Sequence, residues 1–383
     1  MNIQSLIYQD KAIEWKLELM TFKRLTLLVG SSGVGKTQIL KSILNLKKIA
    51  RGTSLNGLEW HIKFSTKTGH FYEWQGCFEN KGFLQNSIFG SDYRENEKNL
   101  PTIDYEKLVI DENLVIDRSG QGIRFNGVKT VKLPQTESVI SLLKEEDQLK
   151  EAYEEFGRIL FNDNNDSEIR RLVFEGEIGA KLKKYTTLES IRNSDESLKT
   201  KLYLSYLNAR KTYDEIKAAF IEIFPYVKDV KVELLSTSDE RIQAFRETPV
   251  IQIKEKGVNN WIDDRSISSG MYRTLMHISA LYLCADGTLI LIDEFENSLG
   301  INCIDELTTS LVSSRRNLQF ILTSHHPYII NNISFNNWKL ITRKAGVVKS
   351  YDATELQIGK SKHKAFTQLI NIDVQTDTIP GKG

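Results

Sequence analysis

Residues Leu27–Leu40 read LLVGSSGVGKTQIL, and this stretch decides the fold. An apolar run ends in glycine, a glycine-rich loop follows, and apolar residues then recur at helical spacing at Ile39, Ile43 and Leu46. The loop matches G-x-x-x-x-G-K-[ST], a pattern in which backbone N–H groups and a helix N-terminus converge on phosphate oxygens. We therefore predict a phosphate-binding loop between a buried strand and a helix.

Every residue of this loop is a candidate ligand contact: Gly30, Ser31, Ser32, Gly33, Val34, Gly35, Lys36 and Thr37. The lysine is expected to reach the β- and γ-phosphates of a nucleotide, and the threonine hydroxyl is expected to hold Mg²⁺. The pattern therefore predicts a nucleotide site that also uses a divalent cation.

Composition sets limits on the class of protein. At 383 residues the chain exceeds the usual size of a single core, so a core with an inserted lobe is expected. Lys and Arg number 51 against 50 Asp and Glu, so no bulk charge indicates nucleic acid. The start MNIQSLIYQD lacks the order of a signal peptide, and no apolar run has the roughly 18 residues of a membrane span. Three cysteines without metal-type spacing, Cys77, Cys284 and Cys303, indicate reduced thiols in a cytoplasmic protein.

The chain divides by its apolar periodicity into three parts. Residues 1–134 read as β-rich: three strands precede the loop, a hairpin follows it, and the segments LVIDENLVIDRS and GIRFNGVKTVKL predict one short strand each. Residues 135–230 read as an inserted helical lobe, with one helical stripe from Leu149 to Leu160 and a three-heptad stripe from Leu202 to Ile223. The segments VKDVKVELL (227–235) and PVIQIKE (249–255) predict strands that follow the helical block, and residues 231–383 form the C-terminal half of the same head as residues 1–134.

Three further motifs follow in the third part. An apolar strand at Leu289–Ile292 ends in Asp293 and Glu294, where α/β sheets place ligands. Upstream of it, Ser268, Ser269 and Gly270 begin an amphipathic helix and could form a second anion site. Downstream, the segment LQFILTSHHP predicts a strand that ends before His325.

In this order, these motifs resemble the ABC-type ATPase heads, especially the SMC-like and OLD-like branch. The resemblance covers roughly residues 1–130 and 230–335, and it implies an α/β head with a mixed sheet, an antiparallel β lobe and an inserted helical lobe. It implies that Asp293 supports Mg²⁺, that Glu294 is the catalytic glutamate and that His325 is a switch histidine. The signature segment is similar to Ile267–Met271, although Ser269 replaces its middle glycine and Met271 its final polar residue, and the D-loop is similar to Asn297–Gly300.

Two features of the resembling family stay open in the sequence. The glutamine that helps to hold the metal is expected at Gln135, with Gln75 as an alternative. An aromatic residue that stacks on adenine is expected upstream of the loop, among Tyr8, Trp15 and Phe22.

The resemblance implies that ATP binds between two copies arranged head to tail, with each loop facing the partner's Ser268–Gly270, and that hydrolysis releases them. A three-heptad insert excludes the long tether of SMC proteins. The compact head is similar to ATPase subunits of anti-phage systems such as PARIS and Septu, which implies a sensor that controls a separate nuclease or toxin. Two alternatives are an SMC-like or RecF-like DNA-repair ATPase, which the balanced charge disfavours, and a scaffold with an idle ATP site.

Overall fold

The computed structural model describes residues 1–82, 100–120, 122–161, 178–234, 249–297, 308–309 and 316–354. The chain forms two compact units. Unit 1 comprises Met1–Asn162, Gly287–Glu294 and Asn317–Gly383, and unit 2 comprises Asp163–Asp286 and Phe295–Arg316. The two ends of the sequence therefore build one unit together, and the first residues of the predicted 135–230 insert belong to that unit.

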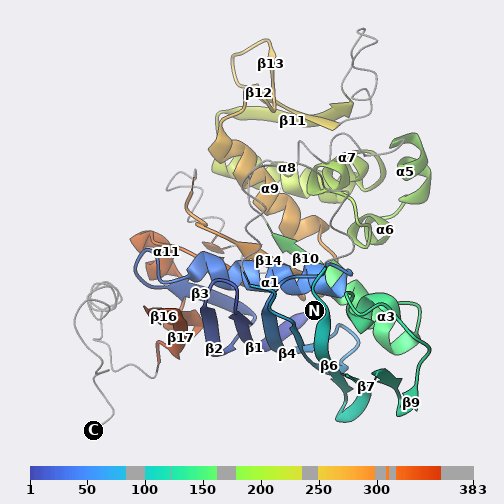
Figure 1. Ribbon diagram of the computed structural model, residues 1–383. Helices are drawn as coiled ribbons and strands as arrows, with labels where there is room; N and C mark the ends of the chain where they lie inside the picture. Colours follow the sequence, from blue (N-terminus) through green and yellow to red (C-terminus); the bar gives the residue numbers. More distant parts are fainter. Residues whose placement is uncertain are drawn as a thin grey trace. The chain divides into compact units, whose positions relative to one another are not determined.

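Unit 1 is organised around one mixed sheet (Figure 1). Its strands in chain order are β1 (Asn2–Asp10), β2 (Trp15–Thr21), β3 (Leu25–Val29), β4 (Leu58–Ser65), β5 (Phe71–Phe78), β6 (Ile103–Ile110), β7 (Asn113–Ser119), β8 (Gly122–Phe125), β9 (Val128–Lys129), β10 (Ile159–Phe161), β14 (Leu289–Ile292), β15 (Gln319–Thr323), β16 (Trp338–Lys344) and β17 (Val347–Asp352). Its helices are α1 (Lys36–Ala50), α2 (Val139–Leu142), α3 (Asp147–Gly157), α11 (Pro327–Asn332) and the 3₁₀ turn η4 (Phe335–Asn337).

The strand order separates a parallel region from an antiparallel one. Neighbours in the order β10-β14-β15-β3-β16 are parallel, and the strands from β2 through β1 and β4 to β9 are antiparallel. The predicted α/β head with a mixed sheet and an antiparallel β lobe is thus confirmed. Parallel strands carry their carboxyl ends to one edge of the sheet, so this region determines where the loops after β14, β15 and β3 meet.

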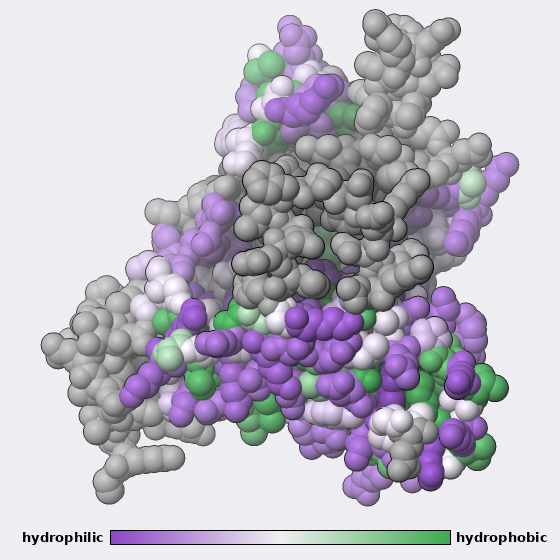
Figure 2. All heavy atoms as spheres, in the orientation of Figure 1, coloured by the Kyte–Doolittle hydropathy of each residue, from purple (hydrophilic) through white to green (hydrophobic). Residues whose placement is uncertain are grey.

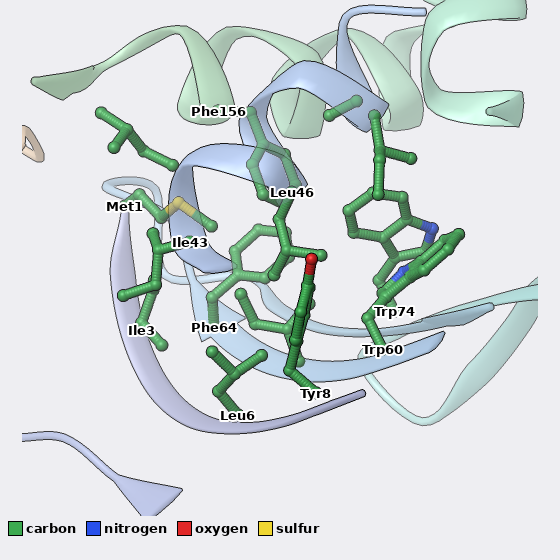
Figure 3. Close-up of a cluster of buried hydrophobic side chains, with 14 of the residues drawn as sticks. Met1, Ile3, Leu6, Tyr8, Ile43, Leu46, Trp60, Phe64, Trp74 and Phe156 are labelled. Atoms are coloured by element: carbon green, nitrogen blue, oxygen red, sulfur yellow. The ribbon is translucent and has the colours of Figure 1, made fainter. Parts of the chain in front are cut away.

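The core of unit 1 lies between α1 and the sheet (Figure 3). Ile39, Ile43 and Leu46 are fully buried, as their helical spacing predicts, and the alternating apolar residues of β4 and β5 face them. Trp60 and Trp74 contact each other with ring centroids 5.0 Å apart. Such an aromatic pair contributes about 0.5–1.5 kcal/mol beyond the area that it buries.

Unit 2 combines helices with a separate sheet. The helices are α5 (Ile178–Lys184), α6 (Leu188–Arg192), α7 (Leu198–Asn208), α8 (Arg210–Ile223) and α9 (Ser269–Leu283). The antiparallel strands β11 (Val227–Leu234), β12 (Pro249–Glu255) and β13 (Trp261–Asp263) form its sheet, and α7 and α8 contact β11. The strands predicted at 227–235 and 249–255 are confirmed, whereas β13 was not predicted.

Four local predictions were wrong. The segment GIRFNGVKTVKL forms two strands, β8 and β9, because Asn126 and Gly127 between them both adopt positive φ and make a hairpin turn. The segment LVIDENLVIDRS forms the end of β6 and all of β7, because Asp111 and Glu112 both adopt positive φ and make a hairpin turn. The predicted helix through Leu160 ends at Gly157, and Leu160 lies in β10, where it pairs with Ile290 of β14. Local turn residues thus divide a continuous-strand pattern, whereas at Leu160 pairing with a distant strand overrides a helical pattern.

The three-heptad stripe also forms two helices, not one. Ala209, with φ −136° and ψ 54°, separates α7 from α8. The side-chain amide of Asn208 donates to the carbonyls of Leu182 and Tyr185, at 3.3 and 2.8 Å. These bonds tie the end of α7 to α5 and its following turn, so the chain turns there although the apolar period continues.

The surface and the thiols complete the description. Among the described residues, no helix combines the length and the apolarity needed to cross a lipid bilayer. On the face shown in Figure 2, hydrophilic side chains are interspersed with small hydrophobic groups; exposed apolar residues of unit 1 include Leu114, Val128 and Val131. Cys77 and Cys284 are buried free thiols, and Cys303 lies outside the described residues.

Gly76 on β5 provides a test of this core. A Cβ at Gly76 would lie 2.5 Å from Cζ2 of Trp60, which is buried and cannot move cheaply. We expect Gly76→Ala to lower the free energy of unfolding by about 1–3 kcal/mol, a typical effect of overpacking. Urea denaturation measures this change.

The matched control is Gly120→Ala, because a Cβ at Gly120 meets no heavy atom within 4 Å. This variant is expected to unfold at nearly the wild-type urea concentration. Equal midpoints for the two variants would contradict the packing of Trp60 against β5.

Candidate functional site

The glycine-rich loop is built by a buried strand and a buried helix. All five residues of β3 are buried, and α1 begins at Lys36 directly after the loop. Gly33 and Gly35 adopt φ of 84° and 101°, a region that favours glycine. A Cβ at Gly30 would lie 2.5 Å from the carbonyl oxygen of Ile341, so this glycine is required by the close approach of β16.

Lys36 places its charge inside this loop. Its side chain is buried, and Nζ donates to the carbonyl oxygens of Gly30 at 2.8 Å and Ser31 at 2.7 Å. Thr37, the next residue, is partly exposed at the start of α1. The loop therefore holds an ammonium group, a hydroxyl and a helix N-terminus together, a combination that binds phosphate.

Two acidic residues lie at the same edge of the sheet. Parallel β14 and β15 place Ile292 beside Leu322, and β15 and β3 place Thr323 beside Leu28. Only β15 separates β14 from β3, so the two outer strands lie roughly 10 Å apart. Asp293 and Glu294 after β14 thus lie at the edge from which the phosphate loop emerges.

Thr323 connects the two acids to the neighbouring strand. Its hydroxyl donates to Oδ1 of Asp293 at 2.6 Å and accepts the backbone N–H of Glu294 at 2.7 Å. Glu294 is exposed and adopts φ of 46°, which costs a non-glycine residue on the order of 1 kcal/mol or more. The bond from Thr323 helps to hold this strained backbone, a role that the sequence pattern did not indicate.

His325 follows β15 at this edge of the sheet. Its side chain is exposed, and the next residue is fixed by a bond from its N–H to the hydroxyl of Ser324 at 3.0 Å. The structure therefore brings together the phosphate loop, Asp293, Glu294 and His325 in unit 1.

Neither candidate glutamine joins this group. The carbonyl of Gln135 accepts the N–H of Ile103, and Glu137 lies beside Gly52, just beyond the C-terminal end of α1. Because a 15-residue helix is about 22 Å long, this segment is far from the loop at the other end of α1. The strand alternation of β5 directs Gln75 to the face opposite α1.

No aromatic candidate is presented for stacking on a base. Tyr8, Trp15 and Phe22 are 2%, 3% and 8% exposed, and all three belong to the core. Trp15 lies beneath the loop, where its Nε1 is 3.3 Å from the position of a Cβ at Gly35. Their burial gives them a packing role in this conformation.

The second predicted anion site lies in unit 2. Ser268 caps α9, with its hydroxyl accepting the N–H of Met271 at 3.3 Å. Ser268 and Ser269 are exposed, and Gly270 is partly exposed. The predicted helix start is confirmed, and it belongs to a different unit from the phosphate loop.

The buried side of α9 contacts the segment that follows Glu294. The Arg273 side chain is buried, and Nη1 donates to the carbonyl of Asn297 at 2.8 Å. The ring of His277 lies 5.5 Å from that of Phe295. Burial, with a further contribution from the charge of Arg273, lowers the pKa of His277 to about 3, so this imidazole is neutral near pH 7. Of the predicted D-loop, residues 298–300 lie outside the described residues.

The Thr323 bridge yields a direct test. Thr323→Val removes the hydroxyl while keeping the shape, so Asp293 loses a donor and Glu294 N–H loses an acceptor. We expect the free energy of unfolding to fall by about 1–3 kcal/mol and the ATP hydrolysis implied by the resemblance to slow by roughly tenfold or more. Urea denaturation and a phosphate-release assay measure the two effects.

Thr323→Ser is the control, because it keeps the hydroxyl on the same backbone. It should retain most of the wild-type activity. If the valine variant instead matches wild type in both assays, the bridge has no role in the site.

The chain is similar to several solved structures. The comparison with curated proteins found no match. Among solved structures, a Smc head bound to the C-winged helix domain of ScpA is 13% identical, covers 92% of this chain and 97% of its own, and has a TM-score of 0.48. A Smc head domain with an extended coiled coil, bound to the C-terminal domain of ScpA and derived from Pyrococcus furiosus, is 14% identical, with coverages of 91% and 96% and a TM-score of 0.47. The SMC head domain from Thermotoga maritima is 12% identical, with coverages of 92% and 99% and a TM-score of 0.43.

The family comparison covers most of the chain. One family model matches residues 25–331, which include the phosphate loop, the start of α9 and both strands that end in the site. The chain therefore belongs to the P-loop ATPase family described as "AAA domain, putative AbiEii toxin, Type IV TA system".

Proposed function

We propose that this chain binds and hydrolyses ATP with Mg²⁺ as cofactor. The observation that carries the proposal is the Thr323 bridge, which holds Asp293 and Glu294 at the sheet edge from which the phosphate loop emerges. A glycine loop with a buried lysine supplies the phosphate site, and a fixed acid pair supplies the groups that hydrolysis needs.

The residues present fit a magnesium nucleotide. The Thr37 hydroxyl and the Asp293 carboxylate are oxygen ligands of the kind that Mg²⁺ prefers, and Thr323 fixes the orientation of the carboxylate. When bound, the cation supplies positive charge at the phosphates. Lys36 adds a second positive group, and Glu294 accepts a proton from the attacking water as general base.

We further propose that the working form is a head-to-tail dimer. The exposed hydroxyls of Ser268 and Ser269 and the N–H groups at the start of α9 are donors suited to a γ-phosphate. We propose that these donors meet the γ-phosphate held by the phosphate loop of a second copy. Loss of the γ-phosphate then removes the group that both copies share.

The biological role that we propose is a sensor that controls a separate effector, a nuclease or toxin, in defence against phage. The family description names a toxin and a Type IV TA system, which supports a chain that acts within a system of more than one component. The near-zero net charge supports a protein partner over DNA.

Glu294→Gln tests the catalytic part of the proposal. The amide cannot accept the proton, so ATP should stay bound and the dimer should persist. We expect hydrolysis to fall by about a hundredfold or more, with a shift from monomer to dimer upon ATP addition in size-exclusion chromatography with light scattering.

The control is Glu296→Gln, which makes the same replacement of a carboxylate by an amide two residues along the chain. It should hydrolyse ATP and return to monomer.

The trapped Glu294→Gln form, purified from its native host, should also carry the effector protein. A monomer at saturating ATP would contradict the dimer, and a chain that arrests growth by itself would contradict a separate effector.

A further inference from the structure

The β16–β17 hairpin contacts the phosphate loop at two places, near Gly30 and at Gly33. β16 pairs in parallel with β3, with Leu340 beside Val29, and the carbonyl of Ile341 leaves no room for a Cβ at Gly30. Further along the hairpin, Nη1 of Arg343 lies 3.5 Å from the carbonyl oxygen of Gly33. The guanidinium of Arg343 therefore lies at the middle of the glycine-rich loop.

The hairpin turn is fixed, and so is the inner part of this side chain. Nε of Arg343 donates to the carbonyl of Ala345 at 2.8 Å, within a turn where Ala345 has φ of 52°. The carbonyl of Gly346 accepts the N–H of Lys16 at 2.9 Å, and a Cβ at Gly346 would clash with the carbonyl oxygen of Glu14. Because Nε is anchored, less conformational entropy remains to be lost when the outer nitrogens bind a ligand.

The charge of Arg343 is not neutralised locally. It is exposed, and among the described residues no carboxylate lies within 4.0 Å of its nitrogens. Lys36 is the one charged residue of the loop from Gly30 to Thr37, and Arg343 adds a second positive charge beside that loop. An exposed arginine usually gains an acidic neighbour or turns to solvent, whereas this one lies at a loop built for anions.

We propose that Arg343 is a second cationic ligand for the polyphosphate, and that it favours nucleoside triphosphates over nucleotides with fewer phosphates. This inference rests on the proposed function of the same loop. A triphosphate carries more negative charge than Lys36 balances, and a guanidinium binds phosphate oxygens through two parallel N–H groups. On nucleotide binding, the outer nitrogens of Arg343 exchange the Gly33 carbonyl for phosphate oxygens.

The experiment is equilibrium binding of ATP, ADP and AMP to the full chain by isothermal titration calorimetry, with Mg²⁺ present. Arg343→Ala should weaken ATP binding by about tenfold or more, ADP binding by less, and AMP binding not at all. It should also reduce the dependence of ATP affinity on salt. Arg343→Lys should recover part of the lost ATP affinity, because lysine restores the positive charge but lacks the two parallel N–H groups of the guanidinium.

The matched control is Lys349→Ala, which removes an exposed cation from β17 of the same hairpin. It should bind ATP as wild type does, and thermal denaturation should show all three variants folded. Wild-type ATP affinity in Arg343→Ala, or an equal loss for ATP and AMP, would overturn this inference alone. Failure of the wild-type chain to bind ATP, with Lys36→Ala behaving identically, would overturn the proposed function and this inference with it.

Discussion

The parallel register of β14, β15 and β3 is the constraint on which the candidate site depends. It brings together chain segments that are more than 250 residues apart in sequence, the loop at Gly30 and the acids at Asp293, at one edge of one sheet. All residues of these three strands are buried, so the register cannot slip without moving apolar side chains out of place. Strand spacing places the two acids near the loop, and the hydrogen bonds of Thr323 then fix the Asp293 carboxylate and the Glu294 backbone.

A second connection runs along the chain from this site. Phe295 and Asn297 follow Glu294 and contact His277 and Arg273 of α9. A helix that begins at a candidate γ-phosphate contact is therefore packed, on its buried side, against the segment that leaves the candidate catalytic glutamate. The neutral, buried His277 contributes to this contact by packing.

The sequence predicted the elements that have strong local signals. The predictions failed where contacts with distant segments of the chain determine the local structure. The phosphate loop, α1, the β4–β5 hairpin and the start of α9 follow from periodicity, glycine and capping residues. Leu160 and the break at Ala209 were missed because strand pairing in one case, and bonds from the Asn208 side chain to the α5 backbone and its following turn in the other, override the local apolar period. Thr323 and Arg343 could not be found by motif, since their roles come from neighbours across strands. Gln135 was chosen by its order in the chain, and the structure places it at the far end of α1.

The central claim is that a complete ATP site needs the phosphate loop of one copy and the start of α9 of another. Two variants, each with one half of the site disabled, test it most directly: Lys36→Ala removes the loop cation, and Gly270→Asp places an acid where the γ-phosphate would lie. Each alone should be inactive. When they are mixed, half of the dimers are mixed dimers with one intact site of two, so ATP hydrolysis should return to about a quarter of the wild-type rate. No recovery on mixing, although size-exclusion chromatography shows that the two variants associate, would contradict the claim.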